Sequence, residues 1–159
     1  MSTDTTSRSP FGLVGWLAAT FAVAFFGAQF TPGEWYALLT KPAWTPPNWL
    51  FGPVWTLLYA MMAVAAYLVW RRFGFAGGGG VALGLFLLQL VLNGLWSWFF
   101  FGLHWIGLAF LDILALWVAI LATIIAFYRL HRIAAWLLIP YLLWVSYAAA
   151  LNLALWRLN

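Results

Sequence analysis

Residues 41–59 read KPAWTPPNWLFGPVWTLLY and contain three Trp and four Pro residues at the entrance to a long apolar run. Each Pro fixes its own φ and restrains the residue before it, so this segment is stiff. Trp side chains are enriched where a bilayer meets water. We therefore expect a rigid aromatic segment at a membrane boundary, where it would form the lid or wall of a site for a flat, apolar ligand.

The composition around this segment is that of a membrane protein. Hydrophobic residues make up 67% of the 159 positions and charged residues only 6%, with a mean hydropathy of +0.98. In an ordinary soluble domain roughly a quarter of the residues are charged. The sequence contains no Cys, which excludes disulfides, thiolate metal sites and thiol catalysis.

Five apolar stretches approach the length of about 20 residues that crosses the hydrocarbon core. They cover residues 11–30, 50–70, 80–101, 105–128 and 133–156. Within lipid they must be helices, because the backbone has no water to bond. We predict an all-α membrane protein, a five-transmembrane-helix bundle forming one domain over 11–159. Residues 1–10 are polar and are expected to be a disordered tail rather than a signal peptide.

The connections between the spans predict the orientation of the bundle. Only the loop from 31 to 49 is long enough to hold structure of its own. The Arg71-Arg72 pair followed by the Gly77–Gly80 run is expected to mark the break between the second and third spans. If the spans alternate, one side carries most of the cations, and the positive-inside rule then places the amino terminus in the cytoplasm. These cations are Arg8, Arg71, Arg72, Arg129 and Arg132, against Lys41 and Arg157 on the other side.

Membrane orientation explains these scattered cations better than a nucleic-acid partner does. The sequence does not distinguish an inner from an outer membrane.

Three spans carry stripes of aromatic and amide residues at helical spacing. The stripes are Phe51, Trp55 and Tyr59; Gln89, Asn93, Trp96 and Phe100; and Tyr141, Trp144, Ala148 and Asn152. Helix packing would account for any one stripe, since amides bond across helices and rings fill gaps. Together they indicate a ring-lined cavity with a few orienting polar groups. The predicted ligand-binding residues are these stripes together with Trp44 and Trp49.

The residues in these stripes and in the Pro-rich segment resemble the TspO/MBR family, whose members are called tryptophan-rich sensory proteins, translocator proteins or peripheral benzodiazepine receptors. The resemblance covers nearly the whole chain. It rests on four ordered blocks: Trp35-Tyr36 through Trp49, Gly52-Pro53-Val54-Trp55 with Leu58-Tyr59, Gln89-Leu90 through Gly102, and Pro140-Tyr141 through Asn152. It implies five transmembrane helices with a ligand cavity beneath the first loop.

The resemblance implies three possible activities. Family members bind porphyrins such as protoporphyrin IX, and also sterols and aromatic drugs, so binding and sensing of a tetrapyrrole comes first, with porphyrin as ligand and no cofactor required. Light- and oxygen-dependent porphyrin degradation is the alternative, with Trp55 and Trp144 matching the two Trp residues implicated. Transport of a porphyrin, sterol or other lipophile is a further alternative. Leu153 stands where the sterol-recognition segment of animal members carries Tyr, which argues against sterol binding there.

A few ionisable residues allow further roles. Asp112 is the one acid inside a predicted span, where it would accept a proton, bind a polar ligand group, or be protonated or bonded to a neighbouring helix. His104 and His131 are interfacial residues or haem-iron ligands, but the sequence has no CxxCH and we predict no metal site. Glu34 would anchor the first loop by pairing with Lys41 or a backbone amide, or contact the polar edge of a ligand.

Small residues at i, i+4 spacing permit close helix approach and, with the family resemblance, favour a homodimer. They are Gly80 and Gly84, Ala18 and Ala22, and Ala24 and Ala28. Packing within one chain would use the same residues.

Overall fold

The computed structural model describes residues 9–159, and every regular element in that range is helical. Residues 1–8, with most of the expected tail and Arg8, lie outside the described residues. The elements are α1 (Gly12–Ala28), α2 (Glu34–Leu38), α3 (Asn48–Phe73), α4 (Gly77–Ser97), the π-helical turn η1 (Trp98–Gly102), α5 (Ile106–Leu130), α6 (Arg132–Leu137) and α7 (Ile139–Leu158). This confirms an all-helical fold for the described residues.

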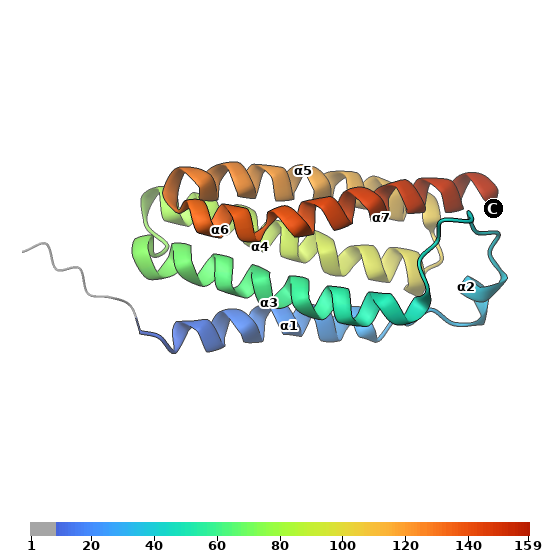
Figure 1. The fold of residues 1–159 in the computed structure, drawn as a ribbon, viewed down its shortest axis with the longest axis horizontal. Helices are drawn as coiled ribbons and strands as arrows, with labels where there is room; N and C mark the ends of the chain where they lie inside the picture. The colour runs from blue at the N-terminus through green and yellow to red at the C-terminus, as the bar shows by residue number, and fades with distance from the viewer. Residues whose placement is uncertain (1–8) are drawn as a thin grey trace, which may run out of the picture.

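The long helices lie lengthwise beside one another in one elongated bundle (Figure 1). α1 packs on α3 and α4, while α5 packs on α4 and on the α6–α7 pair, and α3 contacts α6. The short helix α2 and the carboxyl terminus lie at one end of the bundle, and the α3–α4 turn lies at the other (Figure 1). The first loop therefore covers a single end.

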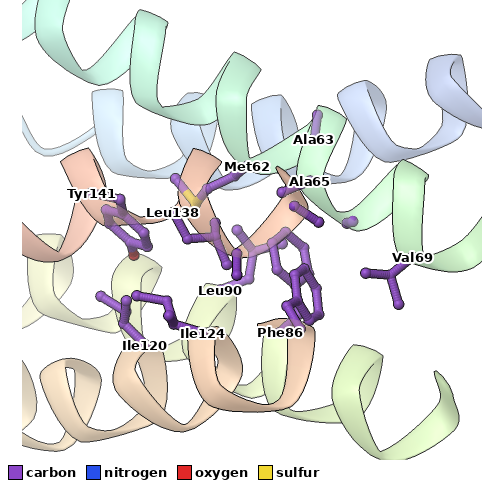
Figure 2. Packing of buried hydrophobic residues seen from close by; sticks show 14 of the residues in the cluster. Met62, Ala63, Ala65, Val69, Phe86, Leu90, Ile120, Ile124, Leu138 and Tyr141 are labelled. Atoms are coloured by element: carbon purple, nitrogen blue, oxygen red, sulfur yellow. The ribbon is translucent and has the colours of Figure 1, made fainter. Parts of the chain in front are cut away.

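Apolar side chains from several helices fill the middle of the bundle (Figure 2). Met62 of α3 and Phe86 of α4 are completely buried, and Phe86 stacks on Phe127 of α5 with ring centroids 6.0 Å apart. Many large apolar side chains nevertheless face outward, among them Val118 and Leu143. An apolar core inside an apolar exterior is typical of a protein surrounded by lipid.

Four helical segments are long and apolar enough to cross a bilayer: Asn48–Phe73, Gly77–Gly102, Ile106–Leu130 and Arg132–Leu158. α1 is also apolar but shorter, with 17 residues. The chain is therefore a multi-pass helical membrane protein. Its helix bounds differ by a few residues from those expected, and the last span is divided at Leu138, next to Pro140, which has no N–H for the helix ladder.

The break between α3 and α4 falls within the expected 71–80 stretch, but it is short, and the Gly77–Gly80 run itself begins α4. The chain reverses between Gly74 and Gly77, which have positive φ angles of 65° and 54°. A Cβ atom on Gly80 would lie 2.2 Å from the carbonyl oxygen of Phe75. The glycines are needed because the turn passes so close to the first residues of α4. Gly80 is thus required by the turn that precedes α4, whereas Gly84 faces open space.

Gly80→Ala is expected to lower the melting temperature of the detergent-solubilised protein, because a backbone carbonyl would have to move to accept the new methyl group. Gly84→Ala is the matched control. It adds the same methyl group to the same helix where no atom lies within 4 Å. In a helix interior Ala is more favourable than Gly by about 1 kcal/mol. Equal melting temperatures for the two variants would contradict this account of the turn.

Candidate functional site

A cavity of about 680 Å³ opens within the bundle at the end that carries the first loop. α1, α3, α4, α5 and α7 all contribute to its walls, and η1 and the first loop contribute as well. Aromatic rings dominate the lining: Phe21, Phe25, Phe30, Tyr36, Phe51, Trp55, Tyr59, Trp96, Phe100, Phe101, Trp144 and Tyr147. Such a space suits a ligand that is largely apolar and flat.

The aromatic stripes of α3 and α7 meet along one wall of the cavity. The rings of Trp55 and Trp144 are nearly perpendicular, at 88°, with centroids 6.5 Å apart. Phe51 approaches Trp144 edge-on at 5.9 Å, and Tyr59 lies 5.6 Å from Trp55. Edge-to-face packing of this kind fixes ring orientation as well as burying area. The wall is therefore a set of rings that hold one another in place.

Most of the predicted ligand-binding residues line this cavity. Those that do are Phe51, Trp55, Tyr59, Asn93, Trp96, Phe100, Trp144, Ala148 and Asn152. Gln89 and Tyr141 are buried behind the wall, and Trp44 and Trp49 also lie outside the lining. Trp49 is 71% exposed in the first turn of α3, and Trp44 packs edge-on against Tyr147. The part of the Pro-rich segment nearest the cavity is thus its helical portion.

A chain of buried hydrogen bonds runs from the cavity wall into the bundle and joins three helices. The Tyr59 hydroxyl donates to Asn93 Oδ1, and Asn93 Nδ2 donates to the Tyr141 hydroxyl at 2.8 Å. That hydroxyl donates in turn to Gln89 Oε1 at 2.8 Å, and Gln89 Nε2 lies 3.8 Å from Met62 Sδ. α3, α4 and α7 are therefore cross-linked by buried polar groups. In this arrangement the amides bind other side chains.

Asn152 makes a second link, between α7, α4 and α5. Its Oδ1 accepts a hydrogen bond from Trp96 Nε1 at 2.9 Å, and its Nδ2 donates to the Ile106 carbonyl at 3.0 Å. The Trp96 ring then stacks on Phe100 with centroids 5.1 Å apart. Asn152, one of the predicted ligand-binding residues, lines the cavity, and both groups of its amide take part in holding the wall.

The π-helical turn η1 follows α4 at the edge of the cavity, and nothing in the sequence indicated it. It places Phe100, which is almost fully buried, and the partly buried Phe101 in the cavity lining. A π-helical turn adds a residue to the helical repeat, and such turns recur at functional sites. Here the local rewinding lets two consecutive rings face the same space.

Two buried polar atoms have no hydrogen-bond partner among the described residues: Nε1 of Trp144 and Oδ2 of Asp112. Trp144 lines the cavity, so its indole N–H is a donor near the ligand space. Asp112 is only 7% exposed but does not line the cavity. A buried donor without an acceptor is costly. Trp144 Nε1 is itself buried, so a ligand oxygen would reach it only after a shift of the indole ring.

The first loop closes the end of the cavity through α2. Tyr36 of α2 is buried, and its burial, with a smaller effect of Tyr147, raises the pKa of its phenol above the usual value. Lys41 lies over the Tyr36 ring at 4.6 Å, and its Nζ donates to the carbonyls of Ala37 and Leu39 at 3.3 Å. Tyr36 is therefore a neutral, ordered part of the wall.

Glu34 does not hold the loop as expected. It is exposed, and within residues 9–159 it forms neither an ion pair with Lys41 nor a hydrogen bond to a backbone amide. Backbone carbonyls take its place as partners of the Lys41 ammonium group, because they lie closer along the chain.

The two histidines have local structural roles. His104, at the turn between η1 and α5, stacks on Trp35 with centroids 4.0 Å apart and planes 9° apart. His131 caps α6, its Nδ1 accepting a hydrogen bond from the Ala134 amide at 3.4 Å. Across the described residues, no cluster of three or more His, Asp or Glu side chains is placed to hold a metal ion.

Sequence reasoning missed the contribution of α1 and α5 to the cavity. Phe21 and Phe25 of α1, and Ile113 and Leu116 of α5, line it. α1 is apolar on nearly every side, so no pattern marks its inner face, and on α5 the buried polar residues Asp112 and Thr123 are not among the cavity-lining residues. Exposed lining residues, such as Phe25 on α1 and Gly52 on α3, show where the cavity opens. We infer that the cavity opens between the carboxyl-terminal part of α1 and the first turns of α3.

Comparison with known proteins shows which family the chain belongs to. The chain is 43% identical over 150 residues to the human translocator protein, with 92% of this chain and 89% of that protein covered. It is 45% identical over 150 residues to tryptophan-rich protein TspO of Archaeoglobus fulgidus, covering 92% and 96% of the two chains. Tryptophan-rich sensory protein of Cereibacter sphaeroides is 41% identical over 143 residues, with 90% and 88% covered. The family profile matches residues 16–157, and the chain belongs to the TspO/MBR family.

Proposed function

We propose that this chain is an integral membrane protein that binds and senses a tetrapyrrole of the protoporphyrin IX type. The observation that carries the proposal is the ring-lined cavity of about 680 Å³ beneath the first loop. Sites for small molecules have volumes of about 300–1,000 Å³ and are mostly apolar, with a few placed polar groups. A flat conjugated macrocycle matches both the size and the aromatic lining.

The binding mode follows from the groups that remain free. The amides of Asn93 and Asn152 are engaged with neighbouring side chains, so they hold the walls rather than the ligand. The ligand would stack among the rings of Trp55, Trp96 and Trp144, and a carbonyl or carboxylate oxygen would accept the indole N–H of Trp144. Entry between α1 and α3 would bring the ligand directly from the bilayer.

We also propose that α1 is a fifth span and that the amino terminus faces the cytoplasm. The 17 residues of α1 cover about 26 Å, slightly less than the hydrocarbon thickness of about 30 Å. The ends of α3 and α5 and the start of α6 carry Arg71, Arg72, Arg129 and Arg132. Cations at these ends favour the cytoplasmic side. A homodimer through the exposed α4 face at Gly84 fits the same arrangement.

Titration of the purified protein with protoporphyrin IX in darkness is expected to quench Trp fluorescence to saturation. Trp144→Phe keeps an aromatic ring but removes the free indole N–H, so it is expected to weaken binding by about three- to tenfold, equivalent to roughly one hydrogen bond. Trp49→Phe is the control, because Trp49 is exposed and lies outside the cavity. Quenching that never saturates in the unmodified protein would rule out the proposed function.

A second candidate, light- and oxygen-dependent degradation of the bound porphyrin, is favoured by the contact between Trp55 and Trp144. Both indoles line the cavity and their centroids are 6.5 Å apart. A porphyrin in van der Waals contact with either ring could draw an electron from it when excited by light. The reduced porphyrin radical would then add oxygen, and return of the electron from the oxygenated porphyrin would restore the Trp, so that porphyrin and oxygen are the net reactants.

If degradation occurs, the double variant Trp55→Phe, Trp144→Phe is expected to form no product under illumination, because Phe is a far poorer electron donor than Trp. Product should be measured by chromatography at saturating porphyrin, so that weaker binding does not mimic lost chemistry. Illuminated porphyrin without protein serves as the control for photobleaching. Equal product from the double variant and the unmodified protein would leave binding and sensing as the remaining function.

A further inference from the structure

The first loop is joined to the far end of the chain by the side chain of Asn159. The Thr40 amide donates a hydrogen bond to Asn159 Oδ1 at 2.8 Å, and Asn159 Nδ2 donates to the Thr40 carbonyl at 3.0 Å. The same Nδ2 also donates to the Leu155 carbonyl of α7 at 2.9 Å. The side-chain amide of Asn159 thus accepts one hydrogen bond from the backbone of Thr40 and donates one to it, as the backbone of a neighbouring strand would.

This pairing lies directly after the part of the loop that closes the cavity. Leu39 precedes Thr40 and packs with Tyr36 on an apolar cluster that includes Leu151 and Leu155 of α7. Tyr36 lines the cavity. Because Asn159 is anchored to α7 through the Leu155 carbonyl, it fixes the loop at the point where the covering segment ends.

A second hydrogen bond ties the same loop to the same helix. The Tyr147 hydroxyl donates to the Trp44 carbonyl at 2.5 Å, and the two rings pack edge-on at 5.7 Å. The loop between α1 and α3 is therefore held down by α7 at two separated points. Tyr147 also lines the cavity, whereas Asn159 does not.

We propose that Asn159 is a positioning residue that holds the first loop closed over the cavity, and that release of its bonds to Thr40 allows ligands to exchange at that end. The statement about ligand exchange rests on the proposed function. The hydrogen bonds are solvent-exposed, so each contributes modestly and the pair can open without unfolding the bundle.

The closure itself can be tested without any ligand, by hydrogen exchange of individual backbone amides. The Thr40 amide is protected by Asn159 Oδ1, so Asn159→Ala is expected to speed its exchange about tenfold. Asn159→Asp keeps an acceptor for this amide and should retain part of the protection. A purification tag belongs at the amino end, so that Asn159 is undisturbed.

Thr40→Ala is the matched control, because Asn159 bonds to the backbone of residue 40 and not to its side chain. After correction for the intrinsic rate of the new residue, its amide should keep its protection. The amide of the buried Phe86 should exchange at the same rate in all variants. Faster exchange at Phe86 would reveal general destabilisation and contradict a local closure.

Ligand exchange is then measured by stopped-flow Trp quenching with protoporphyrin IX. Asn159→Ala is expected to raise the association and dissociation rate constants together, each by about tenfold, with the dissociation constant nearly unchanged, because the loop position changes while the cavity walls do not. Thr40→Ala should leave both rate constants as they are.

The two measurements separate the closure of the loop from its role in ligand exchange. Unchanged Thr40 exchange in Asn159→Ala overturns the closure, whether or not porphyrin binds. Faster Thr40 exchange with unchanged rate constants overturns the role in ligand exchange and leaves the opening between α1 and α3 as the route. If the unmodified protein binds no porphyrin, the proposed function fails, and the exchange of the Thr40 amide alone then decides whether Asn159 holds the loop.

Discussion

Polar groups inside a bilayer cannot bond to water, and this constraint determines how the side chains of this protein are arranged. Asn93 and Gln89 on α4, with Tyr59 and Tyr141 on facing helices, satisfy one another in a single buried chain. Each bond is made between different helices, so satisfying the polar groups also fixes the positions of the helices. The amides thus contribute to stability and to the shape of the cavity at once.

The cavity exists because these bonds and the bulky rings keep the helices apart at one end. In the middle of the bundle small and medium residues such as Ala63 and Met62 are completely buried and pack closely (Figure 2). Trp55, Trp96 and Trp144 are too large and too firmly oriented to collapse into the opening. A space whose walls are already ordered costs little entropy to fill, which is favourable for binding a rigid flat ligand.

Much of this arrangement could be predicted from the sequence, because polar and aromatic residues at helical spacing mark a face. That reasoning identified Asn93, Trp55 and Trp144, which line the cavity. It could not identify the inner face of α1, because a helix that is apolar all round carries no such mark. It also missed η1, because a π-helical turn depends on packing. It misread Gly80 as well, because the requirement for glycine at this position becomes clear only from the position of the Phe75 carbonyl.

The opening between α1 and α3, where Phe25 and Gly52 are exposed, has a consequence for how affinity should be expressed. An opening on the side of a membrane bundle meets hydrocarbon, so the concentration that matters is that of ligand dissolved in the lipid. A hydrophobic ligand partitions strongly into the bilayer, and adding lipid at fixed total ligand dilutes it there. Occupancy would then follow the ratio of ligand to lipid, and a dissociation constant written as a mole fraction in the membrane is the appropriate quantity.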